Sequence, residues 1–261
     1  MMDKMLNFYK YHGTGNDFIL INSFDDDINI SYKNIKHMCH RQFGIGADGL
    51  MILRKKDGYD FEMDFYNSDG KKGSMCGNGG RCIVAFAHHL GIINDKAHFY
   101  APDGEHYAKY FGTNKISLQL NNVNKIETHK LGLFMDTGSP HLVVFKNNAN
   151  GLNVFEQGHT IRYSDDYKEQ GVNVNFVIPD VNTSSVFTYE RGVENQTLSC
   201  GTGTVASAIA LHKSKGINPP VKLATLGGDL TVYFDNIRNN EYNNIWLEGP
   251  VEKVYSGSFR F

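Results

Sequence analysis

The strongest constraint on the fold is an internal repeat at about half the length of the chain. The segment Met75–Gly80 (MCGNGG) corresponds to Ser199–Thr204 (SCGTGT). Their cysteines, Cys76 and Cys200, are 200 − 76 = 124 residues apart in a sequence of 261. Self-similarity at a fixed offset indicates a repeated structural unit. The sequence therefore predicts two halves of one architecture, related by an approximate two-fold axis.

Three further pairs of segments follow in the same order at nearly the same offset. They are Thr14–Ile21 with Thr137–Val144, the strand-like run Phe61–Asn67 with Ser185–Arg191, and the turn Asp103-Gly104 with Gly227-Gly228. A chance similarity between two glycine-rich loops would not produce four correspondences in one order. We interpret the whole chain as a duplication.

Small and apolar residues after each cysteine predict a helix that ends at Gly91 in the first half and at Gly216 in the second. Glycine commonly follows the last helical turn. The other residues form mainly short β-branched and aromatic runs between turns, which predicts strands. The predicted fold is α+β, with two pseudo-symmetric domains, each a curled, mostly antiparallel sheet around a central helix. We place the first half at 1–128, completed by a C-terminal strand at 252–261, and the second at 129–251.

Composition excludes several classes of function. Lys and Arg total 26 against 28 Asp and Glu, a net charge of −2, which argues against binding to nucleic acid or to a membrane surface. No apolar run reaches the length of a membrane span, and the opening MMDKMLNFYK does not have the pattern of a signal peptide. Four cysteines without a Cys-x-x-Cys pair are too few for a disulfide framework. We expect a soluble, cytoplasmic protein.

No cofactor and no metal are predicted. His37, Cys39 and His40 are close in sequence, but no second pair of ligands accompanies them. The run Gly13–Gly15 lacks the third glycine of the dinucleotide-binding fingerprint. Cys39 and Cys82 have no glycine-rich counterpart in the other half, so we expect them to pack in the core.

The positions of Cys76 and Cys200, each just ahead of a predicted helix, favour a chemical role. The unpaired N–H groups and the positive dipole end of a helix stabilise a thiolate there. The same N–H groups can bind a carboxylate, and adjacent glycines let a ligand approach the backbone. If both helix starts converge on one cleft, one sulfur can take a proton from one face of a carbon while the other delivers a proton to the opposite face. The repeat thus predicts two-thiol inversion of a stereocentre beside a carboxylate.

Seven short motifs reinforce this prediction. In chain order they are His12–Phe18, Gly44–Asp48, Asn67–Gly70, Met75–Cys82, Pro140-His141, Glu190–Val193 and Cys200–Gly203. Together they resemble the diaminopimelate epimerase family along nearly the whole chain. The two cysteine motifs are highly specific in combination, and the HGTGNDF start adds independent weight.

The resemblance implies interconversion of LL- and meso-diaminopimelate, the step before lysine and a source of cell-wall crosslinks. It implies no pyridoxal phosphate, no metal, and a homodimer. It also implies that Cys76 and Cys200 are the acid–base pair and that His141 and Glu190 tune their thiols. A guanidinium at Arg191 suits the distal carboxylate of the substrate. The residues that the resemblance places at the substrate are Asn16, Asn67, Gly77, Asn78, Asn173, Glu190, Arg191, Gly201 and Thr202.

Two departures from the family pattern concern substrate contacts. Ser139 stands where many members have asparagine, and Gly49 stands where some have glutamine. The nearest alternative is a proline or hydroxyproline racemase of the same superfamily. Its first cysteine motif usually has histidine at the position of Asn78, and its substrate has no distal carboxylate for Arg191. A phenazine-pathway isomerase would share the fold without the cysteine pair. The missing Cys-x-x-Cys disfavours a thiol redox protein, and the two intact motifs disfavour a non-catalytic binding protein.

Overall fold

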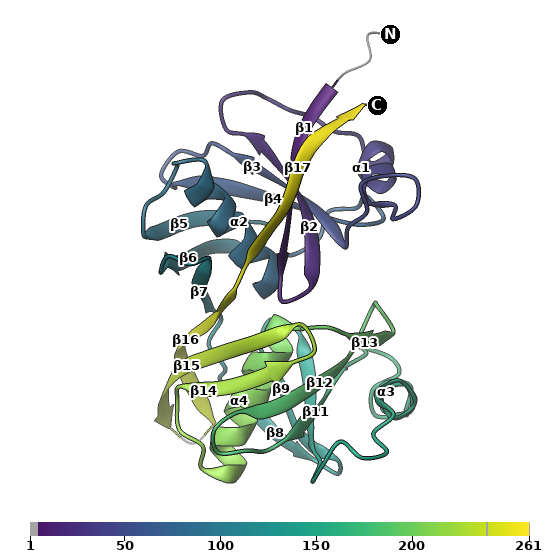
Figure 1. Ribbon diagram of the computed structural model, residues 1–261. Helices are drawn as coiled ribbons and strands as arrows, with labels where there is room; N and C mark the ends of the chain where they lie inside the picture. Colours follow the sequence, from purple (N-terminus) through teal and green to yellow (C-terminus); the bar gives the residue numbers. More distant parts are fainter. Residues whose placement is uncertain (1–4, 239, 261) are drawn as a thin grey trace. The chain divides into compact units, whose positions relative to one another are not determined.

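The computed structural model describes residues 5–238 and 240–260 (Figure 1). The chain divides into two compact units. Unit 1 comprises Met1–Leu118 with Pro250–Phe261, and unit 2 comprises Gln119–Gly249.

The boundary between the two units, after Leu118, lies ten residues before the predicted boundary at 128 (128 − 118 = 10). The physical reason is a strand at Ile126–His129, which the predicted boundary would cut and which pairs with Gly132–Asp136 of unit 2. Residues 1–4 and 261, which the sequence prediction assigns to the first half, lie outside the described residues.

Unit 1 combines one sheet with two helices. Its strands are β1 (Met5–Gly13), β2 (Asn16–Ser23), β3 (Gly49–Arg54), β4 (Phe61–Asn67), β5 (Lys96–Ala101), β6 (Gly104–Tyr110), β7 (Lys115–Leu120) and β17 (Glu252–Arg260), and its helices are α1 (Tyr32–Cys39) and α2 (Gly77–His89). β1 pairs antiparallel with β2 and with the C-terminal strand β17. β2–β3 and β4–β5 are parallel pairs, and the remaining pairs are antiparallel. Parallel neighbours need a crossover, which α1 and α2 supply.

Unit 2 repeats this arrangement. Its strands are β8 (Ile126–His129), β9 (Gly132–Asp136), β10 (Pro140–Phe145), β11 (Asn173–Ile178), β12 (Ser184–Glu190), β13 (Asn195–Thr197), β14 (Val221–Thr225), β15 (Gly228–Arg238) and β16 (Glu241–Pro250), and its helices are α3 (Val154–Arg162) and α4 (Gly201–Lys215). The parallel pairs are β10–β11, joined by α3, and β12–β14, joined through α4. The order β2–α1–β3–β4–α2–β5–β6 thus recurs as β10–α3–β11–β12–α4–β14–β15, with the short strand β13 added between β12 and α4. The predicted α+β fold with a repeated, mostly antiparallel sheet is confirmed.

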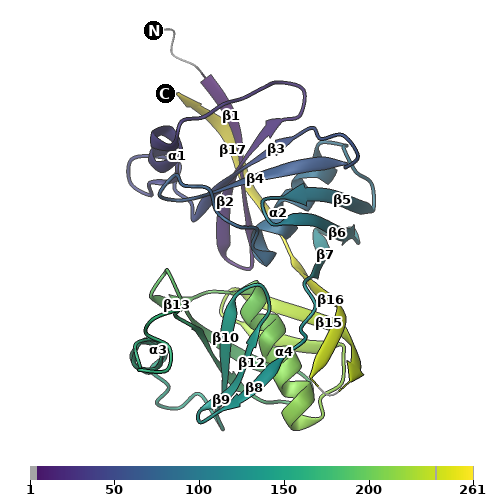
Figure 2. The same ribbon diagram turned by 180° about the vertical axis from the view of Figure 1, so that it is seen from behind.

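The central helix of each unit is buried. In α2 the residues Gly77–Ala87 are buried, and in α4 the buried run is Gly203–Leu211 together with Gly201. Figures 1 and 2 show α4 from opposite sides with the strands of unit 2 around it, and α4 contacts β9, β10, β11, β12, β14 and β15. A helix that is apolar or small on every side can be enclosed in this way. The strands of unit 2 therefore enclose α4.

The two shorter helices were not predicted from the sequence. The side chain of Ser31 caps α1 by accepting a hydrogen bond from the Asn34 N–H, and Asn153 caps α3 through the Glu156 N–H. Helix α1 packs against β3, and Ile35 is among its buried residues. Helix α3 packs against β11, β12 and β13. Within the described residues, no helix is both long and apolar enough to span a membrane.

Candidate active site

Cys76 is the N-cap residue of α2, as the sequence predicts. Its backbone is extended (φ −117°, ψ 150°), and its sulfur accepts a 3.2 Å hydrogen bond from the Gly79 N–H. A Cβ atom at position 79 would lie only 3.2 Å from that sulfur, so glycine leaves the space that the thiol occupies. The residue is partly buried. Donation from the first helical turn favours the thiolate form.

Two asparagines surround this thiol within unit 1. Oδ1 of Asn16 lies 4.0 Å from the sulfur of Cys76 and accepts a 3.3 Å hydrogen bond from Nδ2 of Asn78. Nδ2 of Asn16 donates to Oδ2 of Asp48 at 2.7 Å. The structure therefore brings three predicted residues together, and Asp48 orients one of them.

Asp48 belongs to a charged network at the start of β2. Arg41 Nη2 lies 2.8 Å from Asp17 and 2.7 Å from Asp48, and Lys10 Nζ lies 2.6 Å from Asp17. Burial raises the pKa of Asp17, but the hydrogen bonds from Arg41 and Lys10 outweigh burial and lower it to about 2. The sequence prediction gave Asp48 no role, although it belongs to the Gly44–Asp48 motif that helped to suggest the family.

Arg81 is a second residue whose role the sequence did not reveal. Its guanidinium is fully buried and donates to the Gly77 carbonyl at 3.2 Å, to Asn78 Oδ1 at 3.1 Å and to Thr14 Oγ1 at 3.3 Å. Among the described residues no carboxylate pairs with it, and its Nε has no hydrogen-bond partner. Burial lowers the pKa of Arg81 to about 10, so it stays charged at neutral pH. A cation beneath the first turn of α2 also favours a thiolate at Cys76.

Cys200 is the N-cap residue of α4 and is buried, with 8 % of its surface exposed. No capping hydrogen bond joins its side chain to the first turn of α4 among the described residues. Its sulfur instead lies 3.5 Å from Oγ1 of Thr202. The two duplicated cysteines thus share a backbone position and have different hydrogen-bonding surroundings.

His141, on β10, is completely buried and belongs to the surroundings of Cys200. Its Nε2 lies 2.9 Å from Oγ1 of Thr202, and its Nδ1 lies 3.0 Å from Nδ2 of Asn175. Burial, with a smaller contribution from the charge of Arg191, lowers the pKa of His141 to about 3. The ring is therefore neutral at physiological pH.

The other two cysteines lie in the core of unit 1. Cys39 packs with the buried residues behind α1, and burial raises the pKa of its thiol to about 12. Cys82 is completely buried in α2, and burial raises its pKa as well. Such thiols stay protonated, in agreement with the predicted packing role.

Asn173 links three segments of unit 2. Its Nδ2 donates to Oγ of Ser139 at 2.7 Å and to the carbonyl of Pro140 at 3.0 Å, and its Oδ1 accepts from the Arg191 N–H at 2.9 Å. Both amide N–H groups are therefore used within the protein. Ser139, one of the departures from the family pattern, is one of the two acceptors.

Arg191 and Asn67 occupy equivalent places in the two units. Asn67 is the last residue of β4, and Arg191 directly follows β12, whose last residue is Glu190. The guanidinium of Arg191 is held by the Gln170 carbonyl through a 2.9 Å hydrogen bond. Both residues stand at the end of a strand that precedes a cysteine motif in the chain.

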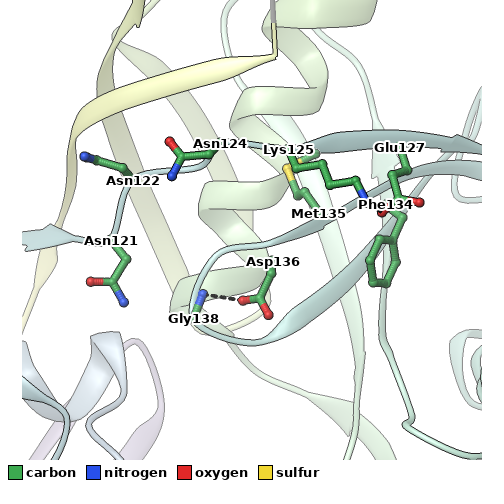
Figure 3. A pocket seen from close by; sticks show the side chains of 9 residues that line it. All are labelled: Asn121, Asn122, Asn124, Lys125, Glu127, Phe134, Met135, Asp136 and Gly138. Atoms are coloured by element: carbon green, nitrogen blue, oxygen red, sulfur yellow. Dashed lines mark hydrogen bonds and ion pairs between the residues drawn. The ribbon is translucent and has the colours of Figure 1, made fainter.

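A pocket of unit 2 lies along β8 and β9 (Figure 3). Its polar lining includes Asp136, which accepts a 2.8 Å hydrogen bond from the Gly138 N–H, and the ion pair Lys125–Glu127 at 2.8 Å. None of the predicted site residues lines it. Among the described residues, no group of three or more His, Cys, Asp or Glu side chains is gathered that could hold a metal ion.

The duplicated fold with a cysteine at the start of each central helix defines the structural class. The fold is shared with a phenazine biosynthesis protein of the PhzF family from Bacillus anthracis (TM-score 0.77, 11% identity, 98% of this chain and 99% of that chain). A hydroxyproline epimerase from Agrobacterium vitis also shares it (TM-score 0.66, 14% identity, 98% and 93%).

Sequence comparison identifies the family within this class. The family model for diaminopimelate epimerase matches residues 8–126 and 133–254. A diaminopimelate epimerase from Flavobacterium psychrophilum is 47% identical over 256 residues, which cover 96% of this chain and 98% of that protein. The chain belongs to the diaminopimelate epimerase family and is an isomerase.

Proposed function

We propose that the protein interconverts LL- and meso-diaminopimelate without a cofactor and that Cys76 and Cys200 are its acid–base pair. One observation carries the proposal: each unit places a cysteine at the N-cap of its buried central helix. The first-turn N–H groups of a helix have no intrahelical acceptor, and they stand beside the sulfur. Each unit therefore offers a thiol and a carboxylate-binding helix start in the same place.

Inversion requires that the two thiols be presented to opposite faces of one substrate carbon. A thiolate removes the α-proton, so that a C–H bond breaks and an S–H bond forms. The second thiol then gives its proton to the opposite face of the same carbon. The first sulfur ends protonated and the second ends as a thiolate, which is the starting state for the reverse reaction.

The reacting carboxylate needs donors as negative charge develops on the adjacent carbon. We assign this role to the backbone N–H groups of Gly77 and Asn78 in unit 1 and of Gly201 and Thr202 in unit 2. Fixed N–H groups at a helix start stabilise such charge without reorganising. Asn16 supports this arrangement because its side chain links Asn78 to Asp48.

The distal end of the substrate distinguishes this function from proline racemisation. We assign the distal ammonium and carboxylate to Asn67, Asn173, Glu190 and Arg191. Arg191 supplies a charged, two-pronged donor for a carboxylate that proline does not have. Asn78 also favours diaminopimelate, because its amide bonds to Asn16 where the racemase pattern usually has histidine.

Family membership also supports a proposal for the setting of the reaction. We propose that the protein acts in the cytoplasm as a homodimer, on a precursor of lysine. Gel filtration with light scattering would measure the oligomeric state directly. A monomer at micromolar concentration would contradict the dimer and leave the chemistry unaffected.

Incubation of the purified, reduced protein with a single substrate tests the proposed activity. LL-diaminopimelate and L-proline are supplied separately without added cofactor, and the products are separated by chiral chromatography. We expect the meso isomer from diaminopimelate and unchanged L-proline. Efficient racemisation of proline, or an unchanged LL isomer, would contradict the proposal.

A further inference from the structure

We propose that Asn175 is a positioning residue that fixes the ring of His141 with its proton on Nε2, so that the Thr202 hydroxyl donates to the sulfur of Cys200. The inference rests on the proposed function of Cys200 and adds a residue that the family motifs do not contain. Because the residues of this network lie on the sheet of unit 2, the surroundings of Cys200 differ from those of Cys76.

The sheet of unit 2 aligns the residues of this network. His141, Asn175 and Thr188 lie on the successive strands β10, β11 and β12. Asn175 stands directly opposite Thr188 in the antiparallel β11–β12 pair. Cross-strand partners of this kind have side chains on the same face and in contact range. This register places Thr188 beside Asn175. These two residues begin a path that continues through His141 to Thr202 at the start of α4.

In the proposed network, the hydrogen bonds along this path all run in one direction. Oγ1 of Thr188 donates to Oδ1 of Asn175 at 2.9 Å, which turns the amide nitrogen toward His141. Nδ2 of Asn175 then donates to Nδ1 of His141 at 3.0 Å. A neutral imidazole has one donor and one acceptor, so acceptance at Nδ1 leaves the proton on Nε2.

The direction continues to the thiol. Nε2–H of His141 donates to Oγ1 of Thr202 at 2.9 Å, and the Thr202 hydroxyl proton can then point to the sulfur of Cys200 at 3.5 Å. Donation to sulfur stabilises a thiolate. With the opposite tautomer, Nε2 would accept the Thr202 hydroxyl, and this donor would be withdrawn from the sulfur.

Gly203 shows how closely α4 approaches this network. A Cβ atom at position 203 would lie 2.3 Å from Oδ1 of Asn175 and 3.3 Å from Cε1 of His141. The second glycine of the Cys-Gly-Thr-Gly motif is therefore required by contact with the Asn175–His141 pair. Packing this close restricts the amide and the ring to the arrangement described.

Unit 1 provides an internal comparison. Phe18 stands opposite Gly49 in β2–β3 as His141 stands opposite Asn173 in β10–β11. Two residues further along β3, Met51 takes the place that Asn175 has on β11, and it pairs with Phe65. A Cβ atom at Gly79 would meet Met51 and Phe18 instead of an amide and an imidazole. Of the two equivalent sets of three strands, only the set in unit 2, the unit of Cys200, carries the polar network.

The nitrogen chemical shifts of the histidine rings test the proposal on the reduced, full-length protein without substrate. For His141 we expect an unprotonated, hydrogen-bonded Nδ1 and a protonated Nε2. In Asn175→Asp, whose carboxylate can only accept, Nδ1 should move to the shift of a protonated nitrogen. His212, bonded to Tyr242 at 3.0 Å in the same unit, should not change. A protonated Nδ1 in the unmodified protein, or no change in the variant, would overturn the proposal.

A second measurement tests the link to the thiol. Thr202→Val removes the hydroxyl and keeps the branched shape, whereas Thr202→Ser keeps the hydroxyl. Alkylation of Cys200 by iodoacetamide, followed by peptide mass spectrometry, should slow about tenfold in the valine variant and recover in the serine variant. Cys76 in the same sample is the control. Unchanged alkylation of Cys200 in Thr202→Val would reject the link. Both readouts are independent of diaminopimelate turnover, so a failure of the proposed function would be recognised separately.

Discussion

The Gly79 N–H donates a 3.2 Å hydrogen bond to the sulfur of Cys76. The equivalent thiol of unit 2, Cys200, lies 3.5 Å from the hydroxyl of Thr202 instead. A duplicated backbone has therefore produced two thiols at the same helical position with different partners. Since the proposed mechanism uses each thiol both as a base and as an acid, this difference can be tested on each cysteine separately.

Replacement of either thiol should nearly abolish epimerisation. We expect Cys76→Ser and Cys200→Ser each to lower kcat by at least about 100-fold, because a serine hydroxyl is a far weaker acid than a thiol. Chiral analysis of diaminopimelate measures the effect. Cys39→Ala, which changes a packed thiol behind α1, is the matched control and should retain most activity. A fully active variant at position 76 or 200 would remove that cysteine from the mechanism.

Arg81 should control the reactivity of Cys76. Because its buried charge favours the thiolate, we expect Arg81→Met to slow alkylation of Cys76 several-fold at pH 7. Cys200 should react at its normal rate. Arg81→Lys keeps the charge and should preserve much of the reactivity of Cys76. The free energy of unfolding of the methionine variant should stay within about 2 kcal/mol of the value for the unmodified protein, since a packed apolar chain can replace a buried charge. Unchanged alkylation would show that Arg81 acts only in packing.

The buried, neutral ring of His141 predicts a loss of stability in mild acid. Its pKa is lowered from 6.5 to about 3 in the folded protein, so below pH 6.5 only the unfolded chain takes up this proton. Stability is therefore lost as pH falls from 6.5 toward 3, and by pH 5 the loss is about 2 kcal/mol. Urea unfolding at pH 7 and pH 5 measures it. His141→Gln should lose about 2 kcal/mol less over this interval, and equal losses would contradict the assignment.

Arg191 should be needed for the substrate and dispensable for the fold. We expect Arg191→Ala to lower kcat/KM at least about 100-fold, because the distal carboxylate loses its charged partner. Its guanidinium makes an exposed contact with the Gln170 carbonyl, so the unfolding midpoint should change little. Arg191→Lys, which keeps a charge and loses the fork, should be intermediate. Near-normal turnover of the alanine variant would exclude Arg191 from the site.

Much of the fold could be predicted because the two halves of the chain share similar short sequence motifs in the same order. The strands around the cysteine motifs, and the ends of α2 and α4 just before Gly91 and Gly216, follow from residue pattern and turn chemistry. The helices α1 and α3 have only eight and nine residues, and their caps, Ser31 and Asn153, were the available signals. The parallel strand pairs depend on contacts between distant segments, which no local pattern reveals.

The residues of the candidate site likewise divide into those that the sequence predicts and those that only the fold reveals. The N-cap positions of Cys76 and Cys200 follow from the glycines and small residues after them. Arg81 and Asp48 lie inside recognised motifs, but their importance comes from burial and from the hydrogen bonds that the fold creates. Asn175 gave no sequence signal, because its hydrogen-bond partners His141 and Thr188 come from other strands. Such roles require the register of the sheet.

Early isotope incorporation in D₂O tests the central claim most directly. With one sulfur for each face, the donor thiol exchanges with solvent before it acts, whereas the abstracted proton stays on the other sulfur until product leaves. In the first part of the reaction from LL-diaminopimelate, mass spectrometry and proton NMR should find deuterium at the inverted carbon of the meso product. The remaining LL substrate should contain almost none. Equal early labelling of substrate and product, or retention of the original hydrogen in the product, would contradict the two-thiol mechanism.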